Sequence, residues 1–321
     1  MISIIITAYN EEKYIERAIA SALAQTHGDV EVIVINDGST DNTRSLAENF
    51  LPDITLYNNE TPTGLMAARN LGVSKASGGH ITFLDGDDEF HIDKVAIQSE
   101  MVNRLPDKSM LFTGRVVFSE TAVPRIPLPA DISGRLITFG YNDVLQKRIT
   151  SLGATFMMRR SDYNELGAMD KEVGKERDFI ARFSFAGGGL YRLCMPLYIQ
   201  HRKPNSMSTQ KEKTYLREVK MMEAWRPADT RHADRNISAD EFKAYEQSVV
   251  DSYKKQFAGS LVAPDVDDKF KAPFLVRLYN YLLQAQKNRI KDARGLNTYK
   301  KFKIVEPQLL AKRPEVEPRQ C

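Results

Sequence analysis

Three short runs of apolar residues, each ending in polar residues, constrain the fold of this chain most. They span residues 2–7, 30–35 and 81–84. Near-continuous apolar runs of this length are typical of strands that are buried on both faces of a parallel sheet. Between the first two runs, apolar residues recur at helical spacing over residues 15–23. The sequence therefore predicts an α/β fold built from β-α-β units, with short connections and right-handed crossovers.

Acidic residues gather where the predicted strands end. The run at 81–84 leads directly into three carboxylates within residues 85–88, and Asp37 follows the run at 30–35. In open α/β sheets, ligands bind at the carboxyl ends of the strands. Carboxylates grouped at that edge are stabilised by a cation, and their oxygens suit Mg²⁺ or Mn²⁺. The alternative is an acidic turn exposed to solvent, because Asp and Gly are common turn residues.

The remaining pattern extends this layout and then changes character near residue 210. Further elements are predicted as strands at 55–57, 110–118 and 154–159, and as helices at 65–73, 93–105 and 176–185. We expect Ser39 or Thr40 to cap the helix that follows the second run. Residues 119–140, which include three prolines, are predicted to form a loop. Beyond residue 210 the sequence predicts helices, at 211–225, 239–257 and 274–290.

The composition limits the classes of protein to which this chain can belong. Its 321 residues, of which 42% are hydrophobic, can bury one large core with or without an appendage. The net charge of +3 gives no argument for binding nucleic acid. No stretch approaches the roughly 18 apolar residues that a transmembrane helix needs. The two cysteines, Cys194 and Cys321, lack zinc-ligand spacing. We expect a cytoplasmic protein with no nucleic-acid partner.

The polar strand ends favour a nucleotide-sugar site over other nucleotide sites. A phosphate bound by the protein alone calls for a Gly-rich loop or a Lys, and neither GxxxxGK[ST] nor GxGxxG after a strand occurs here. A carboxylate can instead accept hydrogen bonds from a base imide or from ribose hydroxyls, and another can hold a metal on a pyrophosphate. We therefore interpret the acids as a phosphate site that works through a metal.

Four ordered segments of the chain resemble family 2 glycosyltransferases. The first holds Tyr9-Asn10-Glu11 and Asp37-Gly38-Ser39-Thr40-Asp41. The second holds Ala68-Arg69-Asn70-Leu71-Gly72, followed by Phe83-Leu84-Asp85-Gly86-Asp87-Asp88 with its DxD motif. The third, residues 156–170, is similar to the acceptor-side segment of the family, and the fourth, residues 198–208, is similar to the stretch that closes the family's domain.

The resemblance implies a GT-A fold, a Rossmann-like mixed sheet with helices on both faces, and an inverting transfer from a nucleotide-sugar donor with Mn²⁺ or Mg²⁺. Carried over to this sequence, it implies that Asp37 contacts the base, Asp85 contacts the ribose and Asp87 binds the metal. The other nucleotide contacts that we expect on this ground are Thr7, Tyr9, Glu11, Arg69 and Gly86. His201 is a metal neighbour in some relatives, and the alternative is a hydrogen-bonded structural histidine.

An inverting transfer also needs a general base for the acceptor hydroxyl. The family places an Asp six residues before an Arg, and counting back from Arg182 reaches Glu176 instead. This departure leaves two candidates for the base, Glu176 and, after a small slip, Asp178. A third possibility is that both are surface partners of neighbouring basic residues.

The resemblance also divides the chain into two parts. Residues 1–210 form the expected catalytic domain, with a nucleotide-sugar half up to about residue 105 and an acceptor half after it, and residues 211–321 form a helical extension. Within the extension, residues 269–303 hold ten basic residues and one acid, and an apolar stripe runs through residues 274–285. Such a helix packs on its own domain or on a second copy of the chain, or it lies on an anionic membrane surface.

We expect an enzyme of the hexosyl- or N-acetylhexosaminyl-transferase class that acts in polysaccharide biosynthesis. Its donor is a UDP-sugar, because Asp37 suits an imide N–H, and its acceptor is a hydroxyl of a glycan or a lipid-linked glycan. One alternative is a non-catalytic nucleotide-sugar or glycan-binding subunit, which the irregular base motif favours. The other is a sugar-nucleotide pyrophosphorylase, which needs a Gly-rich basic loop where this chain has Ala8-Tyr9-Asn10-Glu11.

Overall fold

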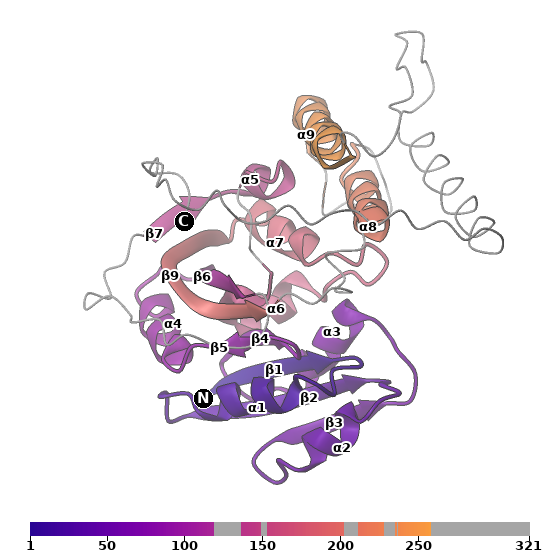
Figure 1. Ribbon diagram of the computed structural model, residues 1–321. Helices are drawn as coiled ribbons and strands as arrows, with labels where there is room; N and C mark the ends of the chain where they lie inside the picture. Colours follow the sequence, from indigo (N-terminus) through magenta and orange to yellow (C-terminus); the bar gives the residue numbers. More distant parts are fainter. Residues whose placement is uncertain (119–135, 149–152, 202–210, 228–234, 236, 258–321) are drawn as a thin grey trace, which may run out of the picture. The chain divides into compact units, whose positions relative to one another are not determined.

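One mixed sheet of nine strands organises the described part of the chain. The strand order is β3-β2-β1-β4-β8-β6-β9-β5, and β7 pairs with β9 (Figure 1). The computed structural model describes residues 1–118, 136–148, 153–201, 211–227, 235 and 237–257. All of these described residues belong to one compact unit.

The first half of the sheet is parallel, as the apolar runs predict. Its strands are β1 (Ile2–Ala8), β2 (Val30–Asp37), β3 (Thr55–Asn59) and β4 (His80–Asp85). The helices between them are α1 (Ile15–Leu23), α2 (Thr43–Glu48) and α3 (Leu65–Lys75). The chain steps outward from β1 to β3 and then returns to the other side of β1 for β4. Right-handed crossovers therefore put α1 and α2, which touch each other, on one face of the sheet and α3 on the other.

The second half of the sheet mixes strand directions. The antiparallel β8 lies between β4 and β6, whereas β6 and β9 are parallel. The elements in chain order are β5 (Glu89–Phe90), α4 (Lys94–Val102), β6 (Ser109–Phe118), β7 (Leu136–Phe139), α5 (Tyr141–Leu145), a 3-10 turn (Gly153–Thr155), β8 (Phe156–Arg159), α6 (Arg160–Leu166), α7 (Glu176–Phe185) and β9 (Gly189–His201). The thirteen-residue β9 curves strongly, which lets it pair with β6, β7 and β5 (Figure 1).

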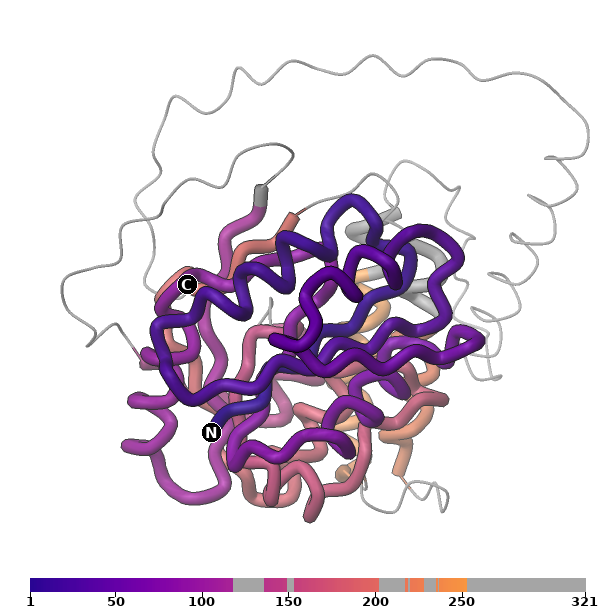
Figure 2. The backbone as a smooth tube through the Cα atoms, turned by 90° about the horizontal axis from the view of Figure 1, so that it is seen from below, coloured from indigo at the N-terminus to yellow at the C-terminus, as the bar shows by residue number. Residues whose placement is uncertain are grey.

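Two further helices, α8 (Lys211–Ala224) and α9 (Ala239–Phe257), pack against α7 and α5. The helix α9 touches α8 and α5, and Trp225 and Tyr245 are fully buried. Seen from below, the indigo and purple chain of the first half lies nearest the viewer, with the pink and orange chain of α6 to α9 behind and below it (Figure 2). No helix among the described residues is long and apolar enough to cross a membrane.

Two sequence-based expectations need comment. Ser39 and Thr40 do not cap α2, because the helix begins at Thr43 and the Oδ1 atom of Asp41 accepts the Thr43 N–H at 3.0 Å. Ser39 instead accepts a hydrogen bond from the Asn10 N–H. The predicted helix at 274–290 and the basic segment at 269–303 lie outside the described residues, so the membrane and dimer interpretations stay predictions.

Candidate active site

The carboxyl ends of β1, β2 and β4 meet at one edge of the sheet. Thr7 in β1 is level with Ile35 in β2 and with Asp85 in β4. Beyond them, the Gly86 N–H donates to the Thr7 carbonyl at 2.9 Å. A Cβ atom on Gly86 would lie only 3.0 Å from the Ala8 Cβ, so the turn after β4 approaches β1 as closely as a glycine permits. The expected nucleotide residues on these three strands are therefore brought together.

Arg69 is the charged centre of this edge. Its side chain is 1% exposed, and its guanidinium rests on the Phe83 ring at 5.2 Å. The Nη2 atom donates to Asp85 Oδ1 at 2.7 Å, and the Nη1 atom donates to Glu176 Oε1. Burial lowers the pKa of Arg69, but the two carboxylates outweigh it and hold the guanidinium charged. Arg69 thus joins the end of β4 to Glu176, the first residue of α7, which lies 107 residues after Arg69 in the chain.

Glu176, the first candidate for the base, therefore lies at the strand ends. Burial is the main cause that raises the pKa of its carboxyl, the Arg69 charge opposes this, and the nearby Asp85 charge adds to it. The Oε1 atom is bound to Arg69, and the side chain is 13% exposed. A raised pKa in a site of this kind suits a group that takes up a proton during a reaction.

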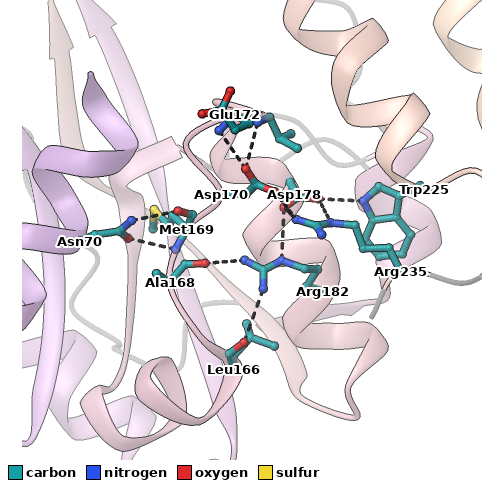
Figure 3. A network of polar contacts seen from close by, with 11 residues as sticks. Asn70, Leu166, Ala168, Met169, Asp170, Glu172, Asp178, Arg182, Trp225 and Arg235 are labelled. Carbon is teal, nitrogen blue, oxygen red and sulfur yellow. Dashed lines mark hydrogen bonds and ion pairs between the residues drawn. The ribbon is translucent and has the colours of Figure 1, made fainter. Parts of the chain in front are cut away.

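Asp178, the second candidate, lies elsewhere. It is fully buried, and its two oxygens accept hydrogen bonds from Trp225 Nε1 at 2.9 Å, from two nitrogens of Arg235 at 2.7 Å each and from Arg182 Nε at 3.2 Å (Figure 3). Four donors fill the accepting capacity of a carboxylate. The structure therefore does not bring Asp178 to the strand ends, and its contacts are those of a structural residue.

The acidic turn, residues 85–88, divides its carboxylates between two environments. Asp85 and Asp87 are partly exposed, whereas Asp88 is 2% exposed. Asp88 accepts hydrogen bonds from the Tyr198 hydroxyl and from the His201 backbone N–H, both at 2.8 Å. Burial, with the charges of Asp87 and Asp85, raises the pKa of Asp88 to about 8. This crowding of negative charge is the environment that a cation relieves.

His201 lies beside this turn. Its Nε2 atom is 2.7 Å from Glu89 Oε1, and its side chain is buried. Burial and the charge of Arg17 lower the pKa of the imidazole, although Glu89 opposes them. Arg17 on α1 also pairs with Glu89 at 2.8 Å and donates to the Asp87 carbonyl at 3.0 Å. A metal contact through His201 stays a prediction.

The sequence did not point to Asp88, Tyr198 and Arg17 as supports of the acidic turn. Tyr198 also accepts the Asp85 N–H at 3.3 Å, so it contacts both ends of the turn. The one available signal is the spacing of Tyr198 and His201 on alternate faces of a strand end, and it becomes informative only when β9 is known to lie beside β5.

Asp37 holds the loop after β3 in place. Its Oδ1 atom accepts hydrogen bonds from Asn59 Nδ2, the Thr63 N–H and the Thr63 hydroxyl, and its Oδ2 atom accepts the Gly64 N–H, all at 2.7–2.9 Å. Burial works to raise the pKa of Asp37, but these hydrogen bonds lower it overall. Gly38 closes the same contact, because at φ +71° its missing Cβ leaves room for Pro62. A direct contact of Asp37 with a base stays a prediction.

The remaining expected nucleotide residues line the same edge. Thr7 is 7% exposed, and its hydroxyl has no hydrogen-bond partner among the residues that the structure describes. Tyr9, just past β1, is 49% exposed, so its ring is open to solvent. Glu11 donates its N–H to Thr43 Oγ1 at 2.7 Å, which ties the loop after β1 to α2. Among the described residues, no group of three or more His, Cys, Asp or Glu side chains is arranged as a metal site.

The chain is similar in sequence to known proteins. The family model described as Glycosyl transferase family 2 matches residues 3–167. An uncharacterized glycosyltransferase of Rickettsia conorii is 32% identical over 197 residues, which cover 55% of this chain and 32% of the relative. Glycosyltransferase GlyA of Streptococcus pneumoniae is 38% identical over 96 residues, which cover 29% of this chain and 14% of GlyA. This chain spans about a third of the length of the Rickettsia conorii relative.

The solved structures most useful for comparison are those of S. aureus TarS. TarS 1-349 in complex with UDP-GlcNAc matches with a TM-score of 0.57 and 18% identity, over 91% of this chain and 83% of that chain. The fold is accordingly the GT-A fold, a mixed sheet with acids at its strand ends. Because the family model covers half of the chain, the chain belongs to glycosyl transferase family 2.

Proposed function

We propose that this protein transfers a sugar from a UDP-sugar to a hydroxyl of a glycan or lipid-linked glycan, with inversion at the anomeric carbon. The observation that carries the proposal is the bridge of Arg69 between Asp85 and Glu176. It joins Asp85 to Glu176. Asp85 lies at the edge of the sheet where β1, β2 and β4 end, which we call the nucleotide edge, and Glu176 belongs to the half of the chain expected to bind the acceptor. A donor and an acceptor bound at this edge therefore both lie beside Glu176.

The donor nucleotide is bound by the ends of β1, β2 and β4. The exposed ring of Tyr9 is available to stack on a base, and the unpartnered Thr7 hydroxyl is available for a polar contact. The UDP and UDP-GlcNAc complexes of TarS, a protein with the same fold, support a uridine nucleotide. Asp85 contributes a partly exposed carboxylate for the ribose hydroxyls.

Asp87 is the residue that would hold Mn²⁺ or Mg²⁺. The raised pKa of Asp88, which burial and the charges of Asp87 and Asp85 cause, fits a cation at the acidic turn. When bound, such a metal supplies charge neutralisation for the departing nucleoside diphosphate.

Glu176 accepts the proton of the acceptor hydroxyl in this proposal. The acceptor oxygen forms a bond to the anomeric carbon while the bond from that carbon to the phosphate oxygen breaks, and the electron pair leaves with the diphosphate. The charge of Arg69 opposes the rise in the pKa of Glu176 that burial causes, and so favours the carboxylate form that a base needs.

The test is release of nucleoside diphosphate from UDP-, GDP- and dTDP-sugars, with Mn²⁺ or with EDTA. We expect metal-dependent release from a UDP-sugar, lost in Asp87→Ala, and lost in Glu176→Gln with UDP affinity retained. Glu48→Gln, in an exposed pair with Arg44 on α2, is the matched control and should keep wild-type turnover. Full turnover of Glu176→Gln would remove the base assignment. Binding of UDP and Mn²⁺ with no release under any condition would instead support a non-catalytic binding subunit.

A further inference from the structure

Three described residues that follow β9 in the chain, Glu218, Trp225 and Arg235, make polar contacts with the first turn of α7, where Glu176 lies. Lys175 at the N-cap of α7 has an extended backbone and supplies no side-chain cap. A helix start without a cap leaves backbone N–H groups unsatisfied and its position weakly fixed. The contacts that fix this turn must therefore come from other elements.

The first contact is a buried carboxylate on α8. Glu218 is 2% exposed and accepts hydrogen bonds from Lys175 Nζ and from Arg177 Nη1, the latter at 2.9 Å and 3.0 Å. Burial works to raise the pKa of Glu218, but the charges of Arg177, Lys175 and Lys147 hold it well below the usual range. Glu218 therefore binds Lys175 and Arg177, the two residues next to Glu176 in the sequence.

The second contact is made by Trp225 and Arg235, which donate three hydrogen bonds to Asp178 (Figure 3). All three side chains are almost fully buried. Arg235 also donates to Asp170 Oδ2 at 3.0 Å, in the loop before α7. Residues 175, 177 and 178 are thus all held by the segment after β9, whereas Glu176 alone is directed to Arg69.

We propose that Glu218, Trp225 and Arg235 are positioning residues for the catalytic carboxylate: they fix the first turn of α7 so that Glu176 meets Arg69 and Asp85. The proposal rests on the proposed function, in which Glu176 is the base. The three residues lie beyond residue 167, where the match with the family model ends. The site of this chain is therefore incomplete without its later helices.

The test compares three variants of the full chain in metal-dependent release of UDP from the UDP-sugar that the wild type hydrolyses. Trp225→Phe keeps an aromatic ring and deletes the N–H that reaches Asp178, and Glu218→Gln deletes the charge that holds Lys175 and Arg177. Tyr141→Phe is the matched control, because it deletes a hydrogen bond from α5 to Glu241 of α9 without touching the first turn of α7. Trp225→Phe is the milder change and keeps the test decisive if Glu218→Gln does not fold.

Displacement of a catalytic group by about 1 Å lowers turnover by up to about 100-fold. We expect kcat to fall by about 10- to 100-fold in Trp225→Phe and Glu218→Gln, with the KM for the donor unchanged, and to stay at the wild-type value in Tyr141→Phe. Wild-type kcat in a folded Trp225→Phe, or an equal loss in Tyr141→Phe, would overturn the proposal. Glu176→Gln separates the two ideas: if it loses turnover while the positioning variants do not, only the positioning role fails.

Discussion

The clearest consequence of the site is the effect of replacing Arg69 by Met, which keeps the length of the side chain and removes its charge. In the wild type, the buried Arg69 lies between Asp85, which is partly exposed at the end of β4, and Glu176, which is largely buried. Tyr163 on α6 also interacts with Glu176, and burial raises the pKa of its hydroxyl to about 12, so it stays neutral. Arg69→Met therefore leaves two carboxylates close together without a cation.

The magnitude follows from the burial of the cluster. Removing one partner of a buried ion pair costs about 3 to 5 kcal/mol of unfolding free energy, because the remaining charge is uncompensated. Two charges about 4 Å apart at an effective dielectric constant of about 20 interact by about 4 kcal/mol, so the ionised form of Glu176 is penalised by a similar amount. We expect a protein less stable by about 3 kcal/mol at neutral pH, with a base that is largely protonated.

The pKa of Glu176 determines whether the stability of Arg69→Met falls or rises with increasing pH. Burial raises that pKa above its ordinary value of 4.5, and loss of Arg69 raises it further. The stability contribution of a carboxyl with a raised folded-state pKa is complete below the unfolded value and is lost as the pH rises through the folded value. The variant should therefore be closest to the wild type in stability near pH 4, and the acidic limb of its pH–rate profile should move to higher pH.

Urea unfolding at several pH values and a pH profile of UDP release test this prediction. Arg44→Met removes the cation of an exposed pair with Glu48 and should cost at most about 0.5 kcal/mol at any pH. Wild-type stability of Arg69→Met, with the acidic limb of its pH–rate profile at the wild-type position, would contradict this prediction. It would mean that the charge of Arg69 does not lower the pKa of Glu176.

Three further variants test the nucleotide edge. Thr7→Val should leave unfolding unchanged, because the hydroxyl has no partner to lose, but should weaken UDP binding in calorimetry. Asp37→Asn should lower the free energy of unfolding by about 1 to 3 kcal/mol, because it disturbs four hydrogen bonds. These hydrogen bonds lower the pKa of Asp37 in the folded protein. The stability difference is therefore present when the pH is above the pKa of Asp37 in the unfolded chain, and it shrinks as the pH falls through the pKa in the folded protein. Tyr9→Ala should weaken UDP binding by about 1 to 3 kcal/mol if the ring stacks on the base, with unchanged stability; unchanged binding would remove Tyr9 from the site.

The sequence predicts the parallel half of the sheet well and the mixed half less well. Strands such as β1 and β4 are buried on both faces, so their apolar runs are nearly continuous and their polar ends are conspicuous. The direction of β8 between β4 and β6 depends on pairings between distant segments, which no local pattern encodes. The predicted capping of α2 by Ser39 or Thr40 was wrong for a similar reason, because Ser39 instead accepts a hydrogen bond from the Asn10 N–H, which belongs to another loop.

The site shows the same division between local and distant information. That acids and Arg69 gather at the strand ends follows from the strand pattern and from the family resemblance. The contact between Arg69 and Glu176 could not be predicted in this way. The two residues approach each other only because β8, α6 and the following loop return the chain to β4. Spacing alone left Glu176 and Asp178 as alternatives, and the contacts of Asp178 with Trp225 and Arg235, which place it away from the strand ends, favour Glu176 in the proposed function.

The helix α3 links the two halves of the site through two adjacent residues. Arg69 reaches Asp85 and Glu176, and the Asn70 amide pairs with both the carbonyl and the N–H of Met169, at 2.9 Å and 3.0 Å. Side chains of adjacent residues point about 100° apart around a helix, so these contacts reach different elements and together restrict both sliding and rotation of the later segment. The rate of a displacement reaction depends on sub-ångström placement of the reacting groups. In the proposed function, the contacts of α3 therefore set the distance between Glu176 and the strand ends at which the donor binds.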